Sequence, residues 1–167
     1  MSDAVRAPQH PTSEHDVSEF DCGVPELDLW LKRRALQNES CRASRTFVIA
    51  EGKRVVGYYA LATGAVSQAV ATGRVRRNMP EPIPVMVLAR LAIDRGQQRS
   101  GLGSALLRDA LLRTLAAAEV AGIRAVLLHA ISEEAKRFYL HHGFAESPVE
   151  PMTMMVTLAD IEKALGR

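Results

Sequence analysis

The chain of 167 residues, 47% of them hydrophobic, carries a formal net charge of +2, so we expect one soluble globular domain over residues 1–167 with a sizeable core. Met1–His10 holds no apolar core of a secretory signal and no run is long enough to cross a bilayer, which argues against a secreted or membrane protein. Two cysteines and five scattered histidines give no metal-ligand spacing, so we expect a cytoplasmic protein with reduced thiols and no metal.

The first third of the sequence predicts a loop, a helix and a hairpin. Ser2–Asp16 is polar and holds two prolines, so we expect a loop or a short edge strand. Pro25–Glu39 predicts a helix, because apolar residues recur at helical spacing behind a proline suited to the first turn. Arg45–Ala50 and Arg54–Ala62 alternate as strands do, and Gly52-Lys53 between them predicts a hairpin turn.

The middle third predicts a connection, a buried strand and a long helix. Gly64–Pro84 is expected to be a long connection. Val85–Ile93 is nearly continuously apolar, as expected of a strand that is buried on both faces. A helix from about Gly101 to Ala121 is apolar almost all round, so we expect it between the sheet and another layer, with Gly122 as its C-terminal cap.

The last third predicts a strand, a short helix and a final strand. Ile123–Ala130 is a second buried strand, and Ser132 is placed to cap a helix that Gly143 would end. Met152–Leu158 is the last strand. Because hairpin strands come first and then alternate with helices, the predicted fold class is α/β (α+β), a mixed central sheet with helices on its faces.

The loop Gln98-Arg99-Ser100-Gly101-Leu102-Gly103 lies between the buried strand and the long helix. Two glycines let backbone N–H groups turn toward an anion, and the helix N-terminus adds further N–H groups and a positive dipole end. Arg99 adds a formal charge. The pattern indicates a phosphate-binding loop, with an ordinary strand-to-helix turn as the alternative.

A known family carries the same succession. The chain resembles the GNAT acetyltransferase superfamily in the order of its elements: a strand, then Gln98-x-x-Gly101-x-Gly103, then a helix, a strand, and Phe138-Tyr139 before Gly143-Phe144. Further motifs resemble the TacT-like GNAT toxins of bacterial toxin–antitoxin modules. They are Phe20-Asp21-Cys22-Gly23 before Leu27-Asp28-x-Trp30-Leu31, Ala43-x-Arg45-Thr46-Phe47-Val48, Gly57-Tyr58-Tyr59-x-Leu61-Ala62-Thr63-Gly64 and Arg77-Asn78-Met79-Pro80-x-Pro82-Ile83-Pro84.

The resemblance implies a GNAT fold with acetyl-CoA in a cleft beside the fourth strand. The backbone of Leu91 and Ile93 would meet the pantetheine arm, Phe138 would line the cleft, and Tyr139 would be the general acid at the thioester sulfur. The pyrophosphate would be held by seven consecutive residues: Gln98, Arg99, Ser100, Gly101, Leu102, Gly103 and Ser104. Ser100 stands where the family often has a basic residue, which removes one charge.

The chemistry of acetyl transfer constrains the acceptor. Tyr139 suits a proton donor, because a phenol with a reference pKa of about 10 stays protonated at neutral pH. The strand Val85–Ile93 offers no carboxylate as general base. A lysine amine would be only about 0.1% neutral at pH 7.4, whereas an α-amine would be tens of per cent neutral. The absence of a base therefore favours an α-amine, although a water chain or a distant Glu could also serve.

The basic residues are concentrated in one part of the chain. Residues 1–31 have a net charge of −6, residues 32–113 of +10 and residues 114–167 of −2. A polyanion such as aminoacyl-tRNA fits this middle section, and a solvated basic surface is the alternative. The candidate contacts are Arg33, Arg34, Arg42, Arg45, Arg74, Arg76, Arg77 and Arg90, with a structural paired role equally open for Arg90.

The resemblance implies a toxin that acetylates the α-amine of aminoacyl-tRNA, blocks translation and is neutralised by a ribbon-helix-helix antitoxin. It also implies a homodimer, and no membrane partner is expected. Two alternatives remain open at this point: a GNAT acetyltransferase of small amines or protein N-termini, and a non-catalytic acetyl-CoA-binding module.

Overall fold

The computed structural model describes residues 7–167. The first part of Met1–His10 and of Ser2–Asp16 lies outside the described residues, and the rest of Ser2–Asp16 contains isolated bridges at Gln9 and Asp16. The chain divides into two compact units. We call them unit 1 (residues up to 62 and 89–110) and unit 2 (63–88 and 111–167). The expectation of one domain over residues 1–167 stays a prediction.

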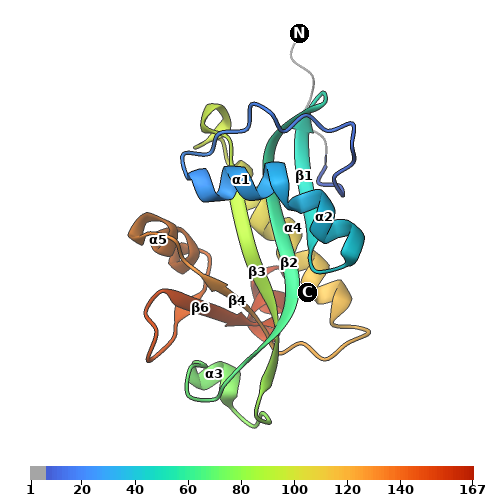
Figure 1. The fold of residues 1–167 in the computed structure, drawn as a ribbon. Coiled ribbons are helices and arrows are strands. Elements are labelled where there is room, and N and C mark those ends of the chain that lie inside the picture. Colours follow the sequence, from blue (N-terminus) through green and yellow to red (C-terminus); the bar gives the residue numbers. More distant parts are fainter. Residues whose placement is uncertain (1–6) are drawn as a thin grey trace. The chain divides into compact units, whose positions relative to one another are not determined.

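Six strands form one sheet in the order β1-β2-β3-β4-β6-β5. β1 pairs with β2 antiparallel, β3 with β4 parallel, and β6 with β4 and β5 antiparallel, which confirms the mixed sheet (Figure 1). The strands are β1 (Arg45–Glu51), β2 (Arg54–Val66), β3 (Ile83–Ile93), β4 (Ala125–His129), β5 (Ala145–Glu146) and β6 (Thr153–Thr157). The helices are α1 (Pro25–Arg33), α2 (Ala35–Cys41), α3 (Gly73–Arg76), η1 (Arg95–Gln97), α4 (Leu102–Ala117), α5 (Glu133–His141) and α6 (Leu158–Ala164).

Several predicted elements differ from the structure. The single helix predicted at Pro25–Glu39 is two helices, because the backbone at Arg34 leaves the helical range with φ at −119°. The connection Gly64–Pro84 contains the end of β2 and all of α3. The strand that the family resemblance counts as the fourth is the third in chain order, because the segment before β1 pairs only through isolated bridges.

The long helix also differs from its prediction. α4 ends at Ala117, so Gly122 is not its cap and has no positive φ. Only one side of α4 is buried, through residues such as Leu106, Leu107 and Ala110. Its opposite side is exposed although it includes alanines, because a small apolar residue is compatible with either environment.

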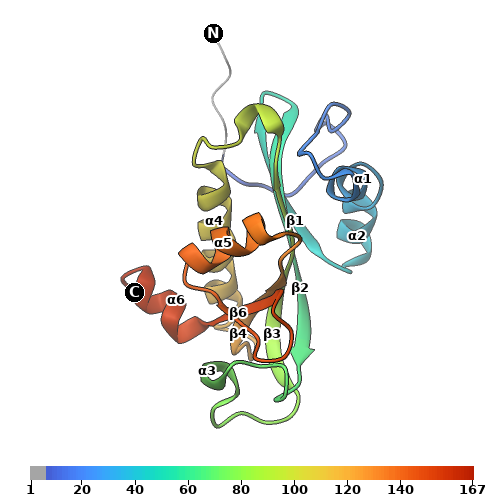
Figure 2. The same cartoon turned by 90° about the vertical axis from the view of Figure 1, so that its left-hand side faces the viewer.

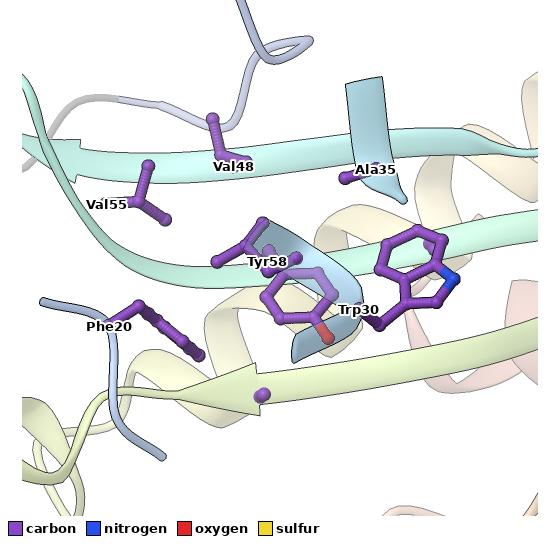
Figure 3. Close-up of a cluster of buried hydrophobic side chains, with 9 residues drawn as sticks. Phe20, Trp30, Ala35, Val48, Val55 and Tyr58 are labelled. Carbon is purple, nitrogen blue, oxygen red and sulfur yellow. The ribbon is translucent and has the colours of Figure 1, made fainter. Parts of the chain in front are cut away.

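Unit 1 has its own core on the β1–β2 hairpin. Tyr58 lies between Phe20 and Trp30, with ring centroids 5.6 and 5.8 Å away (Figure 3). The next residue, Tyr59, points to the other face, where its hydroxyl donates to Asp109 of α4. Figure 2 accordingly shows α1 and α2 on one side of the hairpin and the start of α4 on the other. Trp30 is therefore a core residue.

Unit 2 has a second core between α3 and the neighbouring strands. Val75 of α3 packs with Ala125 and Leu127 of β4 and with Met155 of β6. The parallel pairing of β3 with β4 runs only over Val85–Val87. This cluster defines the face of unit 2 that carries α3.

Both ends of α5 follow the sequence prediction. The Ser132 hydroxyl accepts from the N–H of Ala135 at 3.0 Å, which satisfies one N-terminal donor. At the other end Gly143 has φ at +92°, and the Phe144 N–H donates to Tyr139 O at 3.1 Å. This Schellman arrangement places the Phe144 ring 5.6 Å from that of Tyr139.

We expect Gly143→Ala to lower the free energy of unfolding by about 1 kcal/mol, because an L-residue is disfavoured at positive φ. Gly122→Ala is the matched control: both glycines are exposed and a Cβ would meet nothing within 4 Å at either, but only Gly143 has a positive φ. Denaturant unfolding measures both variants. Equal stability of the two variants would contradict the role of φ at Gly143.

Candidate functional site

The predicted anion-binding loop of unit 1 has the backbone that such a loop needs. Arg99 and Gly101 have φ at +65° and +88°, and the Ser100 hydroxyl donates to Gln97 O. The first helical N–H of α4 belongs to Ala105, which donates to Gly101 O at 3.1 Å. The N–H groups of Leu102 and Gly103 precede it, so they lack an i−4 partner in the helix and lie at its positive end.

The open side of the loop is accessible. Arg99, Ser100 and Ser104 are exposed, and a Cβ built on Gly101 would meet nothing within 4 Å. An anion of phosphate size therefore meets backbone N–H groups and a guanidinium there without steric hindrance. The residues fit the pyrophosphate of acetyl-CoA.

The Gln98 side chain anchors the loop to the rest of unit 1. Its amide nitrogen donates to the carbonyl oxygens of Ile93 and Cys22, both at 2.9 Å. The side chain thus fixes the loop to the end of β3 and to the N-terminal segment. Ile93 is buried and Leu91 half-buried on β3, so the backbone of this strand is held in place by the loop that follows it.

Tyr139 lies on the buried side of α5 in unit 2. Its side chain is 8% exposed, with the Phe138 ring 5.1 Å away on one side and Phe144 on the other. Phe138 is half-buried and also contacts His142, at 4.7 Å between ring centroids. Burial raises the pKa of the Tyr139 hydroxyl to about 12, because the phenolate would lose its hydration. The hydroxyl therefore stays protonated throughout the neutral range.

We expect the Tyr139 phenol to ionise near pH 12 in the folded protein. Since this pKa is raised above the reference value of about 10, the stability it contributes is present below about pH 10 and is lost as the pH rises toward 12. The measurement is a near-ultraviolet titration of the wild type and of Tyr139→Phe, whose difference is the titration of this one group. Ionisation near pH 10 would show that Tyr139 is solvated.

The candidate arginines of unit 1 fall into two groups. Arg33, Arg34 and Arg42 are exposed at or beside the ends of α1 and α2. Arg45 is held by Glu39 at 3.0 Å, and the Arg90 guanidinium lies 4.3 Å from the centroid of the Trp30 ring. A cation–π contact leaves the N–H groups at the rim of a guanidinium able to bind an anion. Arg90 therefore packs against Trp30 and still offers its charge to a phosphate.

The candidate arginines of unit 2 lie on and beside α3. Arg74 forms a two-point ion pair with Asp160, with its Nε 2.8 Å from the carboxylate. That pair holds the pKa of Asp160 below its usual range. Arg76 and Arg77 are exposed. Arg76 also lines a hollow of about 370 Å³. The hollow is lined by Thr72, Gly73, Arg76, Glu146, Ser147, Pro148 and Pro151.

Arg124 is a residue of this region that sequence reasoning missed. Its guanidinium donates to the carbonyls of Arg74 at 2.8 Å, Val75 at 3.1 Å and Arg77 at 3.4 Å. A cation at the carbonyl end of a short helix satisfies groups that have no helical donor. Arg124 therefore fixes the segment that presents Arg76 and Arg77. No local pattern marks it, since its partners lie about 50 residues earlier.

The described part of the chain contains no group of three or more His, Cys, Asp or Glu that could hold a metal ion. Among the same residues, no helix has both the length and the apolar character needed to cross a membrane.

Known proteins share both the sequence and the fold. A family model described as an acetyltransferase (GNAT) domain matches residues 42–146. A tRNA-acetylating toxin of Mycobacterium tuberculosis is 49% identical over 160 residues, 96% of each chain. A probable toxin TacT of Sinorhizobium fredii is 29% identical over 92% of this chain and 91% of its own. One similar solved structure is a Tyr-to-Phe mutant of the toxin AtaT, bound to the C-terminus of the antitoxin AtaR and to acetyl-CoA. It is 25% identical to this chain and superposes with a TM-score of 0.85, covering 99% of this chain and 100% of that chain.

Proposed function

The chain belongs to the GNAT acetyltransferase family, and we propose that it is a toxin that transfers the acetyl group of acetyl-CoA to the α-amine of aminoacyl-tRNA and so blocks translation. One observation carries the proposal: 49% identity over 96% of both chains with a tRNA-acetylating toxin. The activity is that of an acetyl-CoA-dependent N-acetyltransferase, and the two sequence relatives reported above are a toxin and a probable toxin.

The donor end of the reaction involves the loop of unit 1. Backbone N–H groups at Leu102 and Gly103, with the Arg99 guanidinium, would hold the pyrophosphate, and Ser100, Gly101 and Ser104 complete the loop. Gln98 positions the loop through Ile93, and the strand backbone at Leu91 and Ile93 would hold the pantetheine arm. Acetyl-CoA supplies an activated acyl group, and the chain orients it.

The leaving thiolate needs stabilisation, and Tyr139 would supply it as the general acid. Burial keeps the hydroxyl protonated until the C–S bond breaks. A thiol, with a reference pKa of about 8.5, is a stronger acid than this phenol. The hydrogen bond from Tyr139 to the developing thiolate therefore contributes more than a completed proton transfer. Phe138, beside Tyr139, would shield this contact from water.

The acceptor end involves exposed arginines. Arg76 and Arg77 have the exposure and fixed backbone that contact with a phosphate chain requires. In unit 1 the candidate contacts are Arg33, Arg34, Arg42 and Arg90, whereas Arg45 and Arg74 already have carboxylate partners. An α-amine is also the acceptor that suits a weakly basic site, because tens of per cent of it is neutral near pH 7.4.

The test is acetylation with purified protein, labelled acetyl-CoA and three classes of acceptor: a mixture of charged tRNAs, the same tRNAs uncharged, and free amino acids or peptides with a free N-terminus. Label on charged tRNA alone is the expected result. Label on free amines or peptides without label on charged tRNA would identify an acetyltransferase of small amines or protein N-termini. Binding of acetyl-CoA without any label transfer would identify a binding module.

The proposal extends to partners. Toxin relatives include AtaT bound to an antitoxin, and we expect this chain to be neutralised by a ribbon-helix-helix antitoxin and to form a homodimer. Since charged tRNA is used by ribosomes, the proposed site of action is the cytoplasm. Co-expression with the product of a neighbouring gene and light scattering of the purified chain test these two expectations.

A further inference from the structure

Three side chains of unit 2 form a hydrogen-bonded chain that the proposed reaction does not yet use. His129, the last residue of β4, lies opposite Thr153 of β6 in the antiparallel register. Its Nδ1 is 2.8 Å from the Thr153 hydroxyl oxygen. The same hydroxyl donates to the Glu150 carboxylate at 3.0 Å. Thr153 is 4% exposed, whereas His129 is exposed.

The direction of these bonds fixes the tautomer of His129. A carboxylate only accepts, so the single hydroxyl hydrogen of Thr153 points to Glu150. The Thr153 oxygen then accepts from His129, which must carry its hydrogen on Nδ1. In the neutral ring Nε2 then keeps its lone pair, on an exposed side chain. This is the form in which a histidine accepts a proton from a substrate, with a second group orienting the ring.

The surrounding backbone holds the three residues in place. The Thr153 N–H donates to Glu150 O at 2.9 Å, and the Ala130 N–H donates to Met152 O at 2.8 Å. The Ser147 hydroxyl accepts from the Glu150 N–H at 3.2 Å and itself donates to Val70 O. Glu150 is therefore a fixed orienting group, although its side chain reaches solvent.

His129 lies on the face of β4 against which α3 packs. Successive residues of a strand alternate between faces, so His129 shares a face with Ala125 and Leu127. These two pack against Val75 of α3. α3 and its C-cap carry Arg76 and Arg77, the exposed arginines proposed for tRNA. The paired register of β4 with β3 ends at Leu127, so His129 lies beyond it, at the end of the strand.

We propose that Nε2 of His129 is the general base of the transfer, with Thr153 and Glu150 as positioning residues. This inference rests on the proposed function. The amine nitrogen forms a bond to the acetyl carbon and the C–S bond breaks. Nε2 takes one proton from the attacking nitrogen and releases it to solvent. The Tyr139 hydroxyl donates a hydrogen bond to the leaving thiolate, which then takes a proton from solvent. The products are an amide and a free thiol.

The position of the acid in the chain agrees with this assignment. Tyr139 is on α5, the helix that follows β4, and Ser132 caps that helix three residues after His129. The base and the acid therefore come from one strand–helix segment of unit 2. A general base on β4 would also account for deprotonation of the acceptor although Val85–Ile93 holds no carboxylate.

The test is steady-state acetylation of charged tRNA by His129→Ala, with and without added imidazole. We expect kcat to fall by about 10²-fold, the lower end of the range for general bases, while KM for charged tRNA changes by less than about threefold. Because the side chain is exposed, free imidazole should restore kcat by about tenfold or more. Rescue by imidazole separates a proton-accepting role from a structural one.

Thr153 supplies a matched pair of variants. Thr153→Val keeps the shape of the side chain but removes the hydroxyl, and we expect kcat to fall by about tenfold. Thr153→Ser keeps the hydroxyl and should retain the wild-type kcat within about threefold. Circular dichroism checks that both variants fold, and the Ser variant keeps the comparison interpretable if the Val variant is destabilised.

Three results would overturn the assignment: His129→Ala with kcat within about threefold of the wild type, a loss confined to KM, or a loss of kcat that imidazole leaves unchanged. Failure of the proposed function gives a different result, because the wild type itself would then label no charged tRNA. In that case the same variants are assayed on whichever free amine the wild type does acetylate.

Discussion

Tyr139→Phe is expected to lower the turnover of acetyl transfer by about 10²- to 10³-fold. The hydroxyl would be the donor to the developing thiolate, and loss of a hydrogen bond to a charged group in a transition state, together with the general-acid contribution, has this magnitude. The ring keeps its contacts with Phe138 and Phe144, so the fold and the affinity for acetyl-CoA should change little. Calorimetric titration with acetyl-CoA and a label-transfer assay measure the two quantities separately.

The control for this prediction is Tyr58→Phe. Tyr58 is also buried and its hydroxyl donates to Leu27 O at 2.7 Å. Removing it deletes this hydrogen bond and should lower the free energy of unfolding by about 0.5–1.5 kcal/mol, with turnover unchanged at a temperature where the variant is folded. If Tyr139→Phe keeps more than about a third of the turnover, Tyr139 is not the acid.

The backbone of the loop proposed for the acetyl donor could be predicted from sequence because its determinants are local. The two glycines, the preceding apolar run and the following helix are adjacent in the chain. The structure agrees with the local pattern, since Gly101 has a positive φ and α4 starts at Leu102. The function of the Gln98 side chain could not be predicted in the same way. Its partner Cys22 is 76 residues away, and only the folded chain brings the two together.

The helix boundaries show a similar limit. Nothing in the sequence near Arg34 resembles a proline or glycine break, so the periodicity of Pro25–Glu39 predicts one helix. In the structure Ala35 and Trp30 both enter the core of unit 1, and the bend at Arg34 follows from packing on the β1–β2 hairpin. For α4, apolar composition overestimated burial, since alanine contributes to the hydrophobic count without requiring a buried position.

The candidate base and the anchor of α3 were missed for a common reason. His129 and Thr153 are 24 residues apart, and Arg124 is about 50 residues from the carbonyls that it contacts. Sequence reasoning searched the active-site strand for a carboxylate, whereas the structure supplies a histidine on the neighbouring strand, oriented by a hydroxyl from β6. Single residues that act through long-range hydrogen bonds leave no periodic or motif signal in a sequence.

The arginines of α3 lead to the second large effect that we expect. Reversing both exposed charges, as Arg76→Glu with Arg77→Glu, should weaken the binding of charged tRNA by about 10²-fold or more at low salt. Each lost phosphate contact removes released counterions, so the slope of log affinity against log salt should fall by about one per arginine. Filter binding over a series of salt concentrations measures both. The two substitutions would leave the hydrogen bonds of Arg124 intact, because its partners are backbone carbonyls.

The matched control is Lys163→Glu with Arg167→Glu. Both residues are exposed in unit 2 at the end of α6, so the net charge changes equally but on another element. If a general electrostatic attraction explained tRNA binding, the two double variants would weaken it to the same extent. A selective loss at α3 instead means that Arg76 and Arg77 contact phosphates. Arg124→Ala should then weaken binding with both charges still present, because the segment that presents them loses the guanidinium that holds its three carbonyls.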